Sequence, residues 1–319
     1  MKKILLVLLT ILLISVVVLK KMVFEAGDLN HETIVLIRRG ATSNMVASEL
    51  HKANVIKNPL LFKLVARLQG LDKHLKAGEY VFEPKISMVN VLKKMNRGEV
   101  MYRQITIPEG LTAVQIVEML NNNEYLSGEI TDIPTEGSLL PETYTFLRGE
   151  SRNALLKKMA LEMKLLVDKV WQQRDEHLPI KNEGELLVLA SIVEKETGVP
   201  EERSLVASVF VNRLRKRMRL QTDPTVIYAL TNGKKELGRS LLRKDLEFDS
   251  PFNTYKHYGL PPSPICNPGK KAIEAAANPE ISDYLYFVAS GNGGHNFAKS
   301  LEQHNKNVRD WKKIKTKTD

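Results

Sequence analysis

The hydrophobic pattern begins with an uninterrupted apolar run near the start of the chain. The run from Ile4 to Leu19 carries no charge, with "MKK" before it and Lys20 and Lys21 after it. It is slightly shorter than the roughly 20 residues that cross a bilayer core, but flanking lysines can snorkel and the residues that follow them are apolar. We therefore predict a transmembrane anchor over residues 1–23.

Two other interpretations of this run are weaker. A cleaved signal peptide requires small residues at a cleavage site, and the sequence after the run, "VFEA", is a poor one. A buried core helix would be amphipathic, whereas this run is uniformly apolar. Because lysines flank both ends about equally, charge does not set the orientation of the anchor.

Two later segments share a pattern that predicts a strand, a tight turn and a helix. Both run Ile-x-x-Gly-x-Thr into an apolar stripe at helical spacing, and both follow a β-rich run, "TIVLI" in one case and "RQITI" in the other. The threonine is in each case the expected N-cap. The two segments are either copies of a repeated module or two unrelated turns. The second interpretation stays open because short similarities arise easily. They are "IRRGATSNMVASELHKANVI" from Ile37 and "IPEGLTAVQIVEMLNNNEYL" from Ile107.

The remaining periodicity divides the chain into a mixed part and a helical part. A helical "NPLLFKLVARLQG", a strand-like "GEYVF" and a helix from the cap Ser87 to the stop Gly98 lie between the two similar segments. Three helical stripes and a loop-rich tract with short strands follow a Pro/Gly-rich junction. We predict an α+β fold: the transmembrane helix, a small α+β region over 24–150, and an α-rich domain with short strands and a loop-rich cleft over 151–319.

Composition limits the partners and the cofactors. Lys plus Arg number 47 against 37 Asp plus Glu, a net charge of +10, which suits an anionic membrane surface or polymer as well as a merely solvated basic surface. Zinc-finger spacing and an RNP-like strand are absent from the sequence, so we expect no nucleic acid. Cys266 is the single cysteine, and no Cys/His cluster has metal-ligand spacing. We expect no metal and no cofactor.

Candidate chemistry lies in "LVLASIVEKETGVP", which starts at Leu187. At about 100° per residue, Glu196 shares a helical face with the apolar Ile192 and Val193, whereas Glu194 points nearly opposite. A carboxyl at the end of a buried stripe loses hydration, which raises its pKa and suits a general acid. We expect Glu196 to be this group and Glu194 to be solvated.

Two structural alternatives apply to Glu196. The helix is expected to end at Gly198, so the side chain could fray into solvent. A buried carboxylate is also often one half of an ion pair. The candidate cations are Lys195, Arg213 and Arg243.

A family resemblance rests on a series of stretches in a fixed order. The chain resembles the membrane-anchored endolytic murein transglycosylases of the YceG-like family over roughly residues 35–310. The stretches are "EGSLLPETYTF", "LASIVEKET", "VASVFVNRL", "LQTDPTVIYAL", "FNTYKHYGLPPSPICNPG" and "LYFVASGNGGHNFAKSLEQHN". The "GLPPSPIC" loop departs from the usual family pattern at Ser263 and Cys266, which we expect to affect only loop packing.

The resemblance implies a location and a set of partners. The anchor would lie in the cytoplasmic (inner) membrane, with the bulk of the chain on the extracytoplasmic side. A LysM-like region within 24–150 would hold glycan, and a catalytic domain over 151–319 would cut nascent peptidoglycan strands internally. The implied partners are peptidoglycan glycan strands, the membrane and, as candidates, peptidoglycan synthases.

The resemblance also assigns site residues. "EKET" is similar to the Glu-Ser signature of soluble lytic transglycosylases, which makes Glu196, followed by Thr197, the catalytic acid and base that leaves a 1,6-anhydro end. Without the family, the motifs around the other candidates are ordinary turn and loop signals. The alternatives are a non-catalytic peptidoglycan-binding scaffold and a water-using muramidase with Asp223 or Glu194 as second carboxylate. The expected substrate-binding residues are Tyr255, Asn253, Gln221, Asp223 and His295.

Overall fold

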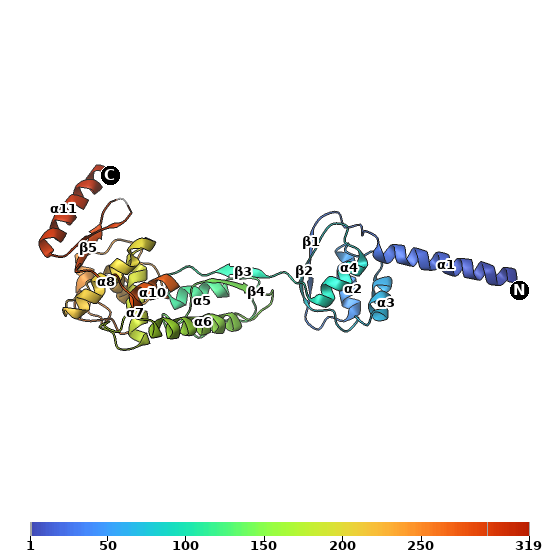
Figure 1. Ribbon diagram of the computed structural model, residues 1–319, viewed down its shortest axis with the longest axis horizontal. Helices are drawn as coiled ribbons and strands as arrows, with labels where there is room; N and C mark the ends of the chain where they lie inside the picture. The colour runs from blue at the N-terminus through green and yellow to red at the C-terminus, as the bar shows by residue number, and fades with distance from the viewer. Residues whose placement is uncertain (1, 292, 319) are drawn as a thin grey trace. The chain divides into compact units, whose positions relative to one another are not determined.

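The computed structural model describes residues 2–291 and 293–318 (Figure 1). Three residues lie outside this description. They are Met1, the first residue of the predicted anchor, Asn292 of the "GNGG" turn, and Asp319, the last residue of the predicted catalytic domain. The chain forms two compact units: residues 1–104 with 145–149, and residues 105–144 with 150–319. This division differs from the boundary that we expected at residue 150, because residues 105–144 pack with the helical part of the chain.

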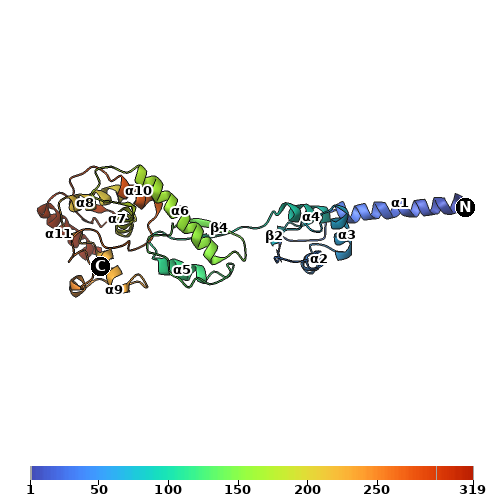
Figure 2. The same cartoon turned by 90° about the horizontal axis from the view of Figure 1, so that it is seen from below.

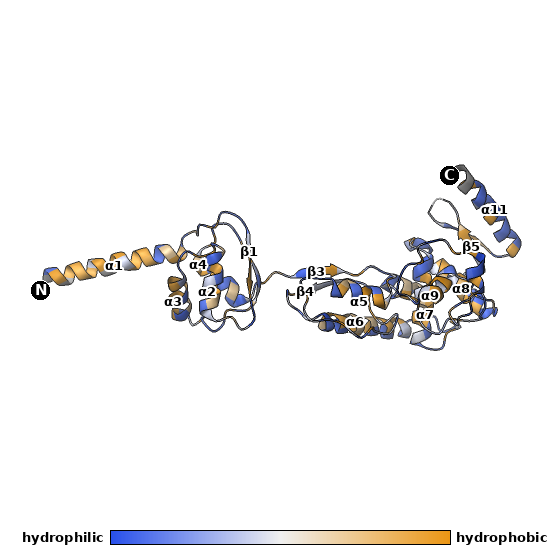
Figure 3. Ribbon diagram, turned by 180° about the vertical axis from the view of Figure 1, so that it is seen from behind, coloured by the Kyte–Doolittle hydropathy of each residue, from blue (hydrophilic) through white to orange (hydrophobic). Residues whose placement is uncertain are grey.

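The first unit begins with the long helix α1 (Lys2–Phe24). Its segment Leu6–Phe24 has a mean hydropathy of 2.5 and is long and apolar enough to cross a membrane, a property that a signal sequence near an N-terminus shares. The hydropathy colouring of Figure 3 shows this apolar run along α1. Val23, near the end of α1, is buried in the core of the first unit.

The body of the first unit is a two-stranded antiparallel sheet packed with three helices. The sheet pairs β1 (Thr33–Ile37) with β2 (Gly78–Phe82), and Ile37 lies opposite Gly78. The fully buried Phe62, Tyr80 and Phe82 are the largest side chains of its core. The predicted strands and helices of this region are confirmed. The helices are α2 (Ser43–Lys52), α3 (Pro59–Leu68) and α4 (Met88–Arg97).

The two similar segments form the same local motif but belong to different units. Thr42 caps α2 by accepting a hydrogen bond from the backbone N–H of Met45. Thr112 caps α5 (Ala113–Asn121) in a full capping box with Gln115. The strands β3 (Arg103–Thr106) and β4 (Thr143–Phe146) pair with each other and carry the chain from one unit to the other and back.

The second unit is built around the helix α7 (Glu183–Glu196). Four helices contact α7, and its residues from Leu189 to Val193 are completely buried (Figures 1 and 2). A hairpin of β5 (Tyr286–Ala289) and β6 (His295–Ala298) packs with the C-terminal helix. The other helices are α6 (Arg152–Gln172), α8 (Arg203–Arg215), α9 (Asp223–Thr231), α10 (Lys270–Ala277) and α11 (Leu301–Thr318).

Details of the second unit differ from the sequence pattern. Pro200–Glu202 forms a separate 3-10 turn, and α8 starts only at Arg203. Within the loop-rich tract, where short strands were expected, "LQTDPTVIY" contains the start of α9 and no strand. The C-terminal "KKIKTKT" forms the end of α11.

A buried carboxylate binds two arginines, one where the chain leaves the first unit and one where it returns. Glu79 is only 3% exposed. Its Oε1 and Oε2 accept hydrogen bonds from Arg103 at 3.0 and 2.8 Å. Its Oε1 also accepts a hydrogen bond from Arg148 at 3.0 Å. Arg103 precedes the departure of the chain from the unit, and Arg148 lies in the segment that returns to it. The hydrogen bonds from Arg103 are the main cause that lowers the pKa of Glu79.

We expect Glu79→Gln to destabilise the first unit by about 3 kcal/mol, because it leaves two guanidinium groups without their shared buried anion. Hydrogen exchange of the β1 and β2 amides, measured by mass spectrometry on the full chain, would report the loss. Since the native pKa of Glu79 is lowered, its stabilisation is present above the ordinary value of 4.5 and is lost as pH falls through the native pKa.

The matched control is Glu99→Gln. Glu99 pairs with Arg97 at 3.3 Å, but both side chains are at least half exposed. Such a pair contributes less than about 1 kcal/mol. Equal exchange in the two variants would contradict the structural role of Glu79.

Candidate active site

The last residue of α7, Glu196, reaches the start of α9. Its Oε1 accepts a hydrogen bond from Oγ1 of Thr222, the buried N-cap residue of α9. Burial raises the pKa of the Glu196 carboxyl, and the charge of Asp223 raises it further, whereas the bond from Thr222 lowers it. Glu196 therefore holds a proton more readily than a solvated glutamate does.

Glu194, on the opposite side of α7, is half-buried. Its Oε2 accepts a hydrogen bond from the backbone N–H of Gly269 at 2.9 Å, at the start of α10. Burial raises the pKa of Glu194 as well, and the charge of Glu109 adds to the effect. The expectation that Glu194 is solvated was wrong, because α10 and its preceding loop cover this side of α7 too.

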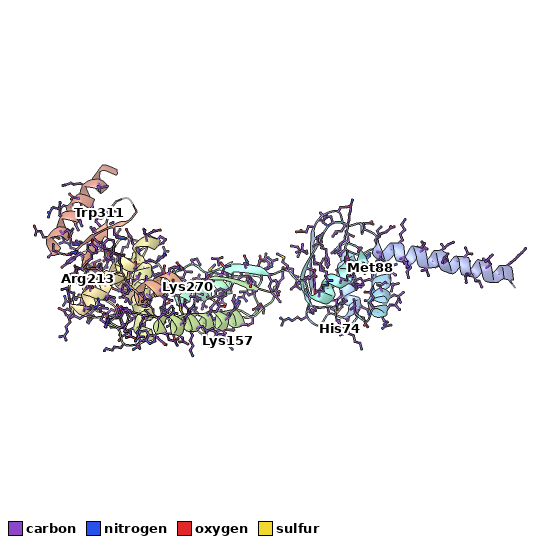
Figure 4. All side chains as sticks on the ribbon, viewed as in Figure 1. His74, Met88, Lys157, Arg213, Lys270 and Trp311 are labelled. Atoms are coloured by element: carbon purple, nitrogen blue, oxygen red, sulfur yellow. The ribbon has the colours of Figure 1, made fainter. Side chains whose placement is uncertain are left out.

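Of the three candidate cations, Arg213 is the one that acts on Glu196. Arg213, labelled in Figure 4, is buried on α8. Its Nε and Nη1 donate to the backbone carbonyls of Leu285 and Leu220, each at 2.6 Å. Its charge lowers the pKa of Glu196 from a distance. Within residues 2–291 and 293–318, no ion pair of 4.0 Å or less joins Glu196 to a basic residue.

The start of α9 and the loop around Tyr255 form one hydrogen-bonded corner. The hydroxyl of Tyr255 donates to Oδ1 of Asp223 at 2.6 Å. Burial raises the pKa of Tyr255, and the bond to Asp223 raises it further. The backbone N–H groups of Gln221 and Thr222 both donate to Thr254, at 3.2 and 3.1 Å. Gln221 itself is exposed and has a positive φ of 47°.

Asn253 lies beneath this corner, where it is completely buried. Its side-chain amide donates to the carbonyls of Leu246 and Phe248 at 2.9 and 2.8 Å, and its Oδ1 accepts from the N–H of Tyr255 at 2.9 Å. Asn253 was predicted to bind substrate, yet every polar atom of its side chain has a backbone partner. The structure places it as a support for the Tyr255 loop.

His295 is held by Glu202, a residue that the site prediction did not include. The backbone N–H of His295 donates to Oε1 of Glu202 at 2.8 Å, and Nδ1 lies 2.6 Å from Oε2. A carboxylate only accepts, so Nδ1 carries the hydrogen and Nε2 is left for another partner. No sequence pattern could reveal the contact, because 93 positions separate the two residues.

Gly294 allows this close approach. A Cβ at position 294 would lie 2.5 Å from Oε1 of Glu202, so a larger residue there would displace the Glu202 carboxylate from its place beside His295. The charge of His295 is one of the influences that lower the pKa of Glu196. The structure therefore brings His295, Asp223 and Tyr255 into the surroundings of one carboxyl.

Comparison with known proteins places this arrangement in a family. The model of the YceG-like family matches residues 35–310. The chain belongs to the YceG-like family. All the residues of the site described above fall inside this YceG-like match.

Relatives of this YceG-like chain carry the name endolytic murein transglycosylase. One from Bacillus subtilis is 34% identical over 320 residues, which cover 90% of this chain and 87% of that relative. One from Streptococcus pneumoniae is 30% identical and covers 85% of this chain, but only 57% of that longer relative is matched. A crystal structure of a YceG-like protein from Listeria monocytogenes, 34% identical, has a TM-score of 0.52 and covers 87% of this chain and 99% of its own.

We expect Thr222→Val to raise the pKa of Glu196 further, because the substitution removes a hydrogen bond to the charged form. Carboxyl ¹³C NMR of the labelled protein would measure the shift. Thr231→Val is the control, since the Thr231 hydroxyl donates to the Ile227 carbonyl of its own helix, at 2.8 Å. The same titration curve in both variants would contradict the contact.

Proposed function

We propose that this YceG-like protein is an endolytic murein transglycosylase with Glu196 as its acid and base. It cleaves nascent peptidoglycan strands between N-acetylmuramic acid and N-acetylglucosamine and leaves 1,6-anhydro ends. The observation that carries the proposal is the Glu196 carboxyl itself: its pKa is raised, and it lies at the end of a buried helix among hydrogen-bonding side chains. The names of the relatives agree with this activity.

In the first step Glu196 donates its proton to the glycosidic oxygen. A raised pKa keeps the carboxyl protonated closer to neutral pH, as a general acid requires. The bond to the muramoyl C1 breaks, and the 2-acetamido carbonyl of the substrate supports the oxocarbenium-like centre. The charge of Arg213 stabilises the Glu196 carboxylate that remains.

In the second step the same carboxylate takes the proton of the muramoyl C6 hydroxyl. The C6 oxygen attacks C1 of the same sugar and closes the 1,6-anhydro ring, so the proton returns to Glu196 and no water is consumed. One carboxyl group suffices, whereas hydrolytic glycosidases normally use two. The mechanism uses no metal and no cofactor.

The surrounding residues have positioning and binding roles in this proposal. Thr222 orients the Glu196 carboxyl through its hydroxyl. Tyr255, held by Asp223, and the exposed Gln221 offer hydrogen bonds to sugar hydroxyls or the acetamido group. His295 presents Nε2 because Glu202 occupies Nδ1.

A water-using muramidase is the second candidate, and one observation favours it. Asp223 is an exposed second carboxylate whose charge acts on Glu196, as a hydrolase requires. The two reactions give different products, a free reducing end with water and an anhydro end without it. A non-catalytic scaffold would give neither.

We also propose where the protein acts. The apolar α1 anchors the chain in the cytoplasmic membrane with its bulk outside the cytoplasm. The first unit is a LysM-like region that holds glycan, which its strand–helix–helix–strand order from β1 to β2 supports. The predicted protein partners are peptidoglycan synthases.

We expect Glu196→Gln to lower the yield of anhydro-terminated fragments from purified peptidoglycan by about 10³-fold, because the general acid is lost. Mass spectrometry identifies these fragments, which are one water lighter than hydrolytic products. Glu194→Gln is the matched control, since its amide oxygen still accepts from Gly269. Reducing-end products from the wild type would make the enzyme a hydrolase, and no products at all would support the scaffold.

We expect Glu202→Gln to lower kcat/KM by about tenfold, the equivalent of one oriented hydrogen bond to a charged group. The ¹⁵N shifts of the His295 ring would show that Nδ1–H is no longer the single tautomer. The exposed neighbour Glu201→Gln should change neither quantity. An unchanged tautomer in Glu202→Gln would disprove the positioning role.

A further inference from the structure

The outer face of α3 carries a stripe of exposed leucines. Leu60, Leu64 and Leu68 are 72%, 49% and 74% exposed, and their spacing of four residues aligns them along one side of the helix. The opposite side packs into the core through Phe62 and Val65. Three aligned, exposed leucines on a ten-residue helix indicate a surface that contacts something apolar.

The stripe lies where α1 enters the first unit. Lys57, just before α3, pairs with Asp28, just after α1. A crevice of about 270 Å³ lies between them, lined by residues of the end of α1, such as Met22, and of the loop that leads into α3, such as Asn58. Figures 1 and 2 show α3 at the same end of the unit as α1, and Figure 4 labels Met88 of α4 at this end too.

Basic side chains flank the leucines. Lys63 and Arg67 follow the stripe on one edge of α3, and Lys57 precedes the helix. The nearby acidic residues Asp28 and Asp72 leave an excess of positive charge. Long basic side chains beside an apolar stripe suit the headgroup region of an anionic bilayer, where the leucines enter the acyl boundary and the cations reach the phosphates.

We infer that the outer face of α3 docks on the surface of the membrane that α1 enters. The apolar segment of α1 ends at Phe24, and Val23, one residue earlier, is already buried in the core of the first unit. The bilayer surface therefore lies at the end of the unit that carries α3. The inference rests on the proposed membrane anchor.

Docking of α3 would give the first unit a second attachment to the bilayer. A single helix allows the unit to rotate and tilt, whereas α1 and α3 together restrict both motions. Because the buried Val23 already joins α1 to the core of the unit, tilting of α1 and lifting of α3 are mechanically linked.

The test places a polarity-sensitive fluorophore at Leu64→Cys of the full chain in vesicles that contain phosphatidylglycerol. The control is Ile34→Cys, because Ile34 is also 49% exposed and lies on β1, at the end of the unit away from α1 (Figure 3). The native Cys266 is fully buried, which protects it from the label. Doxyl-labelled lipids quench a probe only when it lies in the bilayer.

We expect the Leu64 probe to emit at shorter wavelength than the Ile34 probe and to lose most of its emission to the doxyl lipids. Adding Leu60→Ser and Leu68→Ser should return the Leu64 probe to water while the core stays intact. Equal, aqueous signals at the two positions would overturn the docking. A signal that rises with protein-to-lipid ratio without doxyl quenching would overturn it in favour of a second copy.

Flotation of the vesicles separates this inference from the anchor on which it rests. Protein that floats with the vesicles while its Leu64 probe is aqueous retains the anchor and loses the docking surface. Protein that does not float refutes both. The glycan cleavage assay with Glu196→Gln is independent of either result.

Discussion

The burial of α7 is the constraint on which the candidate site depends. Four helices enclose α7, so its residues from Leu189 to Val193 have no contact with water. Val193 is the last buried residue of α7, and Glu196 ends the helix three residues later. The Glu196 carboxyl therefore lies at the edge of an apolar core. Low hydration at this edge is the main reason that the pKa of Glu196 is raised. The chemistry of the site is therefore a consequence of core packing.

Hydrogen bonds between distant segments complete the site around this carboxyl. The start of α9 supplies Thr222 and Asp223, and a buried asparagine, Asn253, fixes the loop that supplies Tyr255. The β5–β6 hairpin supplies His295, whose ring is held by Glu202. Thr222, Asp223, Tyr255 and His295 thus each have a hydrogen-bond partner that fixes the side chain. Preorganised groups of this kind stabilise developing charge without reorganising during the reaction.

The first unit depends on a different buried charge. Glu79 holds Arg103 and Arg148, which lie at the points where the chain leaves the unit and returns to it. The unit therefore keeps a compact core although its sequence is interrupted by residues 105–144. Its exposed surface includes the apolar α1 and the leucine stripe of α3.

The sequence by itself determined the local structure and the main candidate. Helical periodicity, the caps Thr42 and Thr112 and the stop at Gly98 predicted elements that the structure contains, because they act between residues a few positions apart. The apolar face of α7 singled out Glu196 for the same reason. The boundary between the units was not predictable, since it depends on how residues 105–144 pack.

Only the tertiary structure decided what surrounds the candidate residues. The sequence predicted a solvated Glu194, but the loop before α10 covers it. It predicted a ligand-binding Asn253, but three backbone groups occupy its amide. It gave no sign that Glu202 holds His295. Helical spacing shows which side chains share a face, whereas burial and pairing depend on segments that are far apart in the chain and meet only when it folds.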